Sequence, residues 1–189
     1  MADARPDEAQ AGELLRRAAE LRTPLVRAKA RADFYAAGYL VIGLLAVLFG
    51  LVGPDPVSLV VGAAGAAIGW DERREARRLL RGEAGAARAL ARDELVLLGV
   101  LAVYCVLCLT LLRADGAELQ RAAGGSLPGI DLADLTDRLT NIVYPTLLAI
   151  SLIVQGLLAR FYARQEPVAA RYREEAPEWA REALESATG

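Results

Sequence analysis

The sequence predicts an all-α, polytopic membrane protein, with four transmembrane helices in a bundle and cytoplasmic amphipathic helices at both ends. Four apolar stretches contain no Asp, Glu, Lys or Arg, and the charged residues crowd into the segments between them. Nineteen of the twenty-two basic residues lie in segments that a four-helix topology places on one side of a membrane. About 20 apolar residues cross a bilayer as a helix, and the flanking Lys and Arg set its orientation. The expected transmembrane helices are residues 35–53, 56–70, 95–112 and 141–159.

These helices divide the chain into three parts and orient it in the membrane. The parts are a cytoplasmic N-terminal helix (1–33), a transmembrane domain (34–159) with a cytoplasmic helix (71–94) and an outer loop (113–140), and a cytoplasmic C-terminal tail (160–189). Short Arg-rich segments stay in the cytoplasm, so we expect both termini there. Twenty-one of the basic residues are Arg, a bias typical of a GC-rich bacterial genome, so the expected location is a bacterial inner membrane.

The N-terminal segment has the pattern of an amphipathic helix from Asp7 to Arg22. Thr23 and Pro24 then resemble a helix cap followed by a first-turn proline, which predicts that a new helix begins there. After the first transmembrane helix, Gly53-Pro54-Asp55-Pro56 is turn chemistry, with Asp55 as the expected cap of the second helix. The first two crossings therefore form a tight hairpin.

Small residues recur at three- and four-residue spacing along both helices of this hairpin. Such stripes let helix backbones approach closely in lipid, where the hydrophobic effect does little to bring helices together. The predicted packing residues are Gly43, Gly50, Ser58, Gly62, Gly65 and Gly69. Packing within the hairpin is the first interpretation, and an interface between subunits of a homo-oligomer is the alternative.

Residues 71–94 mix acidic residues and arginines at helical spacings, which favours a cytoplasmic helix continuing from the second crossing. Leu79, Leu80, Ala87 and Leu90 give it a weak apolar stripe. Gly82 and Gly85 predict a break in this helix.

The third apolar stretch contains a C-x-x-C pair, Cys105-Val106-Leu107-Cys108, followed by Arg113. This segment resembles the active-site region of the quinone-coupled, four-helix disulfide oxidoreductases of the DsbB and vitamin K epoxide reductase type. The resemblance implies a membrane thiol/quinone oxidoreductase. Those families relay electrons through a second cysteine pair, whereas this chain has two cysteines in all. Both also lie at the outward end of a helix, where the dipole opposes thiolate formation, so the residues themselves favour two inert apolar side chains.

The fourth apolar stretch carries the only sustained polar face in the membrane, whose members are three, seven and four residues apart and so share one side of a helix. The face consists of Asn141, Tyr144, Ser151 and Gln155. One interpretation is a hydrated pore or ligand groove, and the other is hydrogen bonding between helices. Before this stretch, Leu132, Leu135 and Leu139 predict a short helix on the outer membrane surface. After it, Pro167 and Pro177 divide the tail, and a surface helix is expected from Glu178 to Ser186.

The chain has no histidine and no recognisable catalytic motif, so we expect no enzyme activity, no metal and no cofactor. A net charge of −2 argues against a nucleic-acid partner. The sequence favours a non-catalytic membrane scaffold or partner-binding subunit, surrounded by the lipid bilayer and associated with copies of itself or with another membrane protein. One alternative is a homo-oligomeric channel lined by the polar face of the fourth helix. The other is the thiol oxidoreductase described above.

Overall fold

The computed structural model describes residues 7–53, 56–110 and 132–187, and all the regular secondary structure in these ranges is helical. The helices are α1 (Glu8–Val52), α2 (Pro56–Leu80), α3 (Ala86–Thr110), α5 (Leu132–Ala163), α6 (Glu166–Glu175) and α7 (Glu178–Ser186). The expected cap Asp55 and most of the expected outer loop lie outside the described residues.

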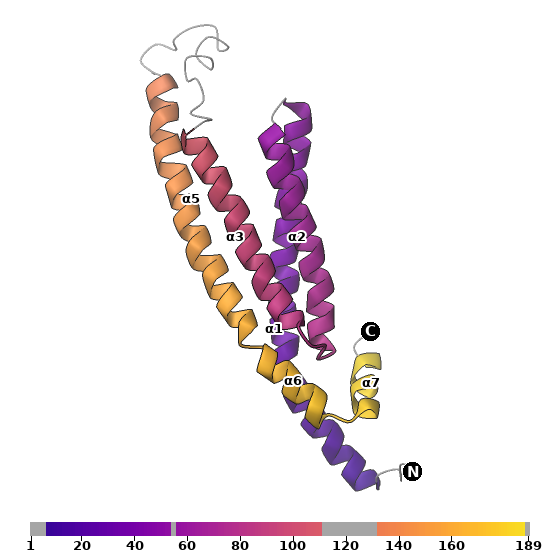
Figure 1. Cartoon of the computed structure of the whole chain (residues 1–189). Coiled ribbons are helices and arrows are strands. Elements are labelled where there is room, and N and C mark those ends of the chain that lie inside the picture. Colours follow the sequence, from indigo (N-terminus) through magenta and orange to yellow (C-terminus); the bar gives the residue numbers. More distant parts are fainter. Residues whose placement is uncertain (1–6, 54–55, 111–131, 188–189) are drawn as a thin grey trace.

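The four long helices form two pairs (Figure 1). Helix α1 packs along α2, α3 packs along α5, and a smaller contact between α2 and α3 joins the two pairs. The pairs lie close together near α6 and α7 and diverge toward the opposite end (Figure 1). The two helix pairs are therefore packed together at one end and lie further apart at the other.

Three segments are long and apolar enough to cross a membrane: α1, α3 and Asp137–Glu175, most of which is α5. Their large apolar side chains are exposed in the isolated chain; Phe49 is 70% exposed and Ile153 is 62% exposed. A soluble monomer rarely exposes so large an apolar surface, so the helices indicate a membrane-embedded protein. Helix α2 does not meet the same length and composition, because its uncharged part ends at Trp70.

The main hydrophobic core lies at the charged end of the molecule, where α6 and α7 pack against the first half of α1. Leu25, Leu79 and Tyr162 are fully buried there. Two polar contacts fix the C-terminal segment to α1: Arg17 forms an ion pair with Glu175 at 2.8 Å, and Arg22 donates a hydrogen bond to the Leu184 carbonyl at 2.6 Å. The extensions are thus one packed unit with the ends of the long helices.

The helix boundary expected at Thr23 and Pro24 is absent, because α1 continues through both residues. Proline removes one helical N–H donor, but Thr23 and Glu20 are exposed, so water can solvate the carbonyl left without its usual donor. The Thr23 hydroxyl donates to the Ala19 carbonyl at 2.9 Å within the helix. Burial of Leu25 against the C-terminal segment further favours a continuous helix.

The break predicted at Gly82 and Gly85 is present. Residues 71–94 form the end of α2 and the start of α3, joined by a turn in which Gly82 and Gly85 have φ of 69° and 81°. These are left-handed backbone conformations that glycine adopts readily. The separate surface helix expected around Leu139 is instead the first part of α5. The C-terminal helix α7 occupies the expected residues.

Candidate functional site

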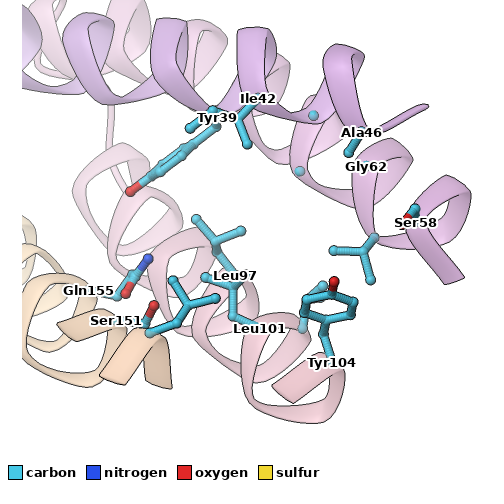
Figure 2. Close-up of a pocket in the computed structure, with 15 residues that line it drawn as sticks. Tyr39, Ile42, Ala46, Ser58, Gly62, Leu97, Leu101, Tyr104, Ser151 and Gln155 are labelled. Carbon is cyan, nitrogen blue, oxygen red and sulfur yellow. The ribbon is translucent and has the colours of Figure 1, made fainter. Parts of the chain in front are cut away.

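A crevice of about 380 Å³ lies between the two hairpins (Figure 2). Its walls come from all four long helices and are mostly apolar, with Ile42 and Val61 on one side and Leu101 and Leu147 on the other. Ligand sites commonly have volumes of about 300–1,000 Å³ and apolar walls with a few polar groups. The crevice therefore has the size and lining of a site for a small apolar or amphiphilic molecule.

The polar side chains of the crevice gather mainly at its inner end, toward α6. Ser151 and Gln155 of α5 are each 5% exposed and line the crevice. Tyr39 extends from α1, and its hydroxyl points toward the end where Gln155 and Ser151 lie (Figure 2). The Gln155 side-chain oxygen has no hydrogen-bond partner among the described residues. The crevice is thus mostly apolar and has polar groups at its inner end.

A layer of buried acids lies behind this inner end of the crevice. The Tyr39 hydroxyl donates a hydrogen bond to Glu94 at 3.0 Å. Glu94 and Glu72 are each 1% exposed. Tyr162 of α5 is fully buried and interacts with both acids. No Lys or Arg among the described residues forms an ion pair with either glutamate. We call Tyr39, Glu72, Glu94 and Tyr162 the acid layer.

The acid layer favours a protonated Glu72. Burial, followed by the neighbouring Glu94 carboxyl group, raises the pKa of Glu72 to about 9. Neither carboxyl oxygen of Glu72 makes a hydrogen bond of good geometry with the described residues, although the Glu94 carboxyl group and the Tyr162 hydroxyl lie close to it. An ionised carboxylate with no cation beside it is costly in a buried position, so the proton is retained at neutral pH. Burial also raises the pKa of Glu94, to about 7, so the acid layer behind the crevice carries at most about one negative charge at neutral pH.

Sequence reasoning missed the acid layer, because it treated the acids of residues 71–94 only as part of a charged cytoplasmic helix. The buried residues of α2 include Glu72, Glu75, Ala76 and Leu79, at helical spacing on one face. On α3, Leu90, Glu94 and Leu97 are buried at the same kind of spacing. An acid that replaces an apolar residue within such a stripe is the signal that could have identified both positions.

The predicted polar face of α5 does not act as one surface. Ser151 and Gln155 line the crevice, whereas Tyr144 packs edge to face against Tyr104, with ring centroids 5.8 Å apart. Asn141 is exposed near the far end of the helix. The structure therefore brings two of the four predicted residues into the candidate site.

The small-residue stripes meet inside the α1–α2 hairpin. A Cβ added to Gly62 would lie 2.7 Å from the Gly43 carbonyl oxygen, and one added to Gly69 would lie 2.8 Å from the Ala36 carbonyl oxygen. A Cβ on Gly65 would meet only ordinary contacts, the nearest at 3.8 Å, and Gly65 and Ser58 also line the crevice. Gly50 is buried on α1. Gly43, Gly62 and Gly69 thus allow two helix backbones to touch.

The two cysteines are free and buried, and neither lines the crevice. Cys108 interacts with the hydroxyl-bearing rings of Tyr104 and Tyr144, so the pair faces α5. Among the described residues, no group of three or more His, Cys, Asp or Glu side chains is placed to hold a metal ion. The crevice offers apolar walls and a few hydrogen-bonding groups to a bound molecule.

Comparison with known protein families, curated proteins and solved structures finds no match to this chain.

Proposed function

We propose that this protein is a non-catalytic, multi-pass protein of a bacterial inner membrane, with four crossings and both termini in the cytoplasm. Helix α2 is the fourth crossing, because it runs back along α1 and exposes Val60 to 69%. Its uncharged stretch is short, but long Arg side chains after Trp70 can extend to the headgroup layer. The excess of arginine at the α6–α7 end supports a cytoplasmic position for that end.

We further propose that the protein works by binding the apolar part of a lipid or of another membrane-soluble amphiphile in the crevice. The observation that carries this proposal is an apolar crevice between the hairpins that ends at a polar, buried layer. A ligand with an acyl chain would place that chain against residues such as Ile42 and Leu101. Its polar group would lie near Gln155, whose oxygen is available.

The size of the crevice favours such a ligand over a partner helix. A transmembrane helix about 30 Å long and about 10 Å across occupies roughly 2,400 Å³. The crevice holds about 380 Å³, so a helix could enter only if the hairpins moved apart. The scaffold or binding subunit expected from the sequence is therefore refined to a subunit that binds a small amphiphile.

Gly65→Leu is expected to lower the occupancy of the bound amphiphile. The added side chain begins with ordinary contacts at 3.8 Å or more and then extends into the crevice. Forcing extra methylene groups into occupied space costs about 1–3 kcal/mol, so ligand occupancy should fall about tenfold. The measurement is mass spectrometry of lipids and small amphiphiles released from protein purified in native-lipid particles.

Gly99→Leu is the matched control, since it adds the same side chain to an exposed position of α3 where a Cβ meets nothing within 4 Å. The control should retain its ligand at the wild-type level. Equal occupancy in Gly65→Leu and wild-type protein, with both folded by circular dichroism, would remove the crevice as the binding site.

A further inference from the structure

A second hollow of about 430 Å³ lies between α1 and α2, near the charged end of the molecule. It is lined by Lys29 and Asp33 of α1 and by Trp70, Arg73 and Arg77 of α2, and we call it the basic notch. Three cations and one carboxylate give its lining a net charge of +2. The basic notch shares no lining residue with the crevice.

The arginines of the basic notch are free to bind a ligand. Arg73 and Arg77 are exposed and form no hydrogen bond or ion pair with the described part of the chain. Arg78, the next residue, is by contrast paired with Glu75 at 2.8 Å and with Glu83 at 2.7 Å. Residues four apart lie on one helix face, so the unpaired guanidinium groups of Arg73 and Arg77 both line the basic notch.

Lys29 and Trp70 complete a set of donors. Lys29 is held by an ion pair with Asp33 at 2.6 Å, and its side chain is 30% exposed. Trp70 is 66% exposed and ends the uncharged stretch of α2. Tryptophan at the end of an apolar helix is typical of the lipid headgroup layer. With the membrane topology proposed above, the basic notch lies at the headgroups of the cytoplasmic leaflet.

We propose that the basic notch binds a phosphate group, with Arg73 and Arg77 as its main ligands. Guanidinium groups match the geometry of phosphate oxygens, and basic pockets between helices on the cytoplasmic side bind the headgroups of anionic lipids. The phosphate comes either from a phospholipid of that leaflet or from a soluble phosphate compound. The proposal rests on the proposed topology and is independent of the ligand in the crevice.

The test is a titration of the full chain in detergent micelles with phosphatidylglycerol, followed by native mass spectrometry. The double variant Arg73→Gln/Arg77→Gln is expected to bind phosphatidylglycerol about 30-fold more weakly, since each basic residue near anionic headgroups contributes about 1 kcal/mol. Two further arms use phosphatidylcholine and inorganic phosphate. If phosphatidylglycerol binding falls in the double variant and millimolar inorganic phosphate does not compete with it in the wild-type protein, the phosphate group comes from the lipid. Competition by inorganic phosphate identifies a soluble source.

The matched control is Arg74→Gln/Arg160→Gln, which removes the same charge from exposed positions outside the basic notch. It is expected to bind within about threefold of the wild-type protein, and Arg73→Lys/Arg77→Lys should retain part of the affinity. Equal losses in the two Gln double variants would overturn the proposal, because they would show attraction by total charge alone. Unchanged binding in Arg73→Gln/Arg77→Gln would overturn it as well. The ligand content of the crevice should stay at the wild-type level in every variant.

Discussion

Gly62→Ala is expected to lower the melting temperature of the protein by about 4–12 °C, whereas Gly38→Ala is expected to raise it by about 2–4 °C. A Cβ at Gly62 would lie 2.7 Å from both the Gly43 carbonyl oxygen and the Val47 backbone nitrogen. These are backbone atoms, so relief requires separation of α1 and α2, at a cost of about 2–3 kcal/mol. A Cβ at Gly38 meets nothing within 4 Å and gains up to about 1 kcal/mol of helix propensity.

The two variants carry the same chemical change on the two helices of one hairpin, so their opposite signs isolate the backbone contact. The measurement is thermal unfolding in one detergent, followed by circular dichroism at 222 nm. Gly69→Ala should behave like Gly62→Ala, because its Cβ would lie 2.8 Å from the Ala36 carbonyl oxygen. A Gly62→Ala protein as stable as Gly38→Ala would contradict the close approach of α1 and α2.

This hairpin shows what the sequence could predict and where prediction had to stop. Spacing alone identified the small residues and left open whether they pack within the chain or between copies. The structure places Gly62 against Gly43 within one hairpin, and that pairing depends on the relative rotation of two helices, which no single-helix pattern contains. The all-helical class and the membrane-spanning character of three segments were predictable, because long uncharged apolar runs have few other stable environments.

The crevice and the acid layer were not predicted, for a related reason. Residues 71–94 carry charge on every face in sequence, so the apolar stripes that contain Glu72 and Glu94 are only a weak signal, and the meeting of the two acids is seen only when α2 and α3 are placed together. Glu72 and Glu94 come from different helices and meet only in the packed structure. Ser151 and Gln155 were found from spacing, but Asn141 follows the same spacing and lies on the exposed surface. Helical periodicity shows which residues of one helix share a face. It does not show how far along that face a neighbouring helix extends.

The acid layer supports the proposed binding function over conduction through a single chain. An ion that passed along the polar side of α5 would have to cross a level at which Glu72, Glu94 and Tyr162 are at most 1% exposed. Leu158, near the same end of α5, is 7% exposed. These side chains are almost inaccessible to solvent in one chain, which supports a crevice closed at its inner end.

Glu72→Gln is expected to stabilise the protein at alkaline pH and to have little effect below about pH 4.5. The folded-state pKa of Glu72 is raised to about 9 from 4.5, chiefly by burial. Between these values the folded chain keeps a proton that the unfolded chain has released, so the contribution of Glu72 to stability falls as the pH rises. The fall is at most about 1.4 kcal/mol per pH unit and ends near the folded-state pKa. Gln has the shape of the protonated acid and does not ionise, so the variant lacks this loss.

The measurement is the melting temperature of wild-type, Glu72→Gln and Glu174→Gln proteins at several pH values from 4.5 to 9.5. The groups that face Glu72 are Glu94 and Asp93 of α3 and the hydroxyls of Tyr39 and Tyr162, and all of them remain in the variant. The melting temperatures of Glu72→Gln and wild-type protein are therefore expected to be nearly equal at the acid end, and their difference should increase up to about pH 9. Glu174 is exposed on α6, so Glu174→Gln should follow the wild-type curve. Parallel curves for Glu72→Gln and wild type would mean that Glu72 is not buried as an acid, and an alkaline loss of stability in Glu72→Gln alone would show that its charge is needed for folding.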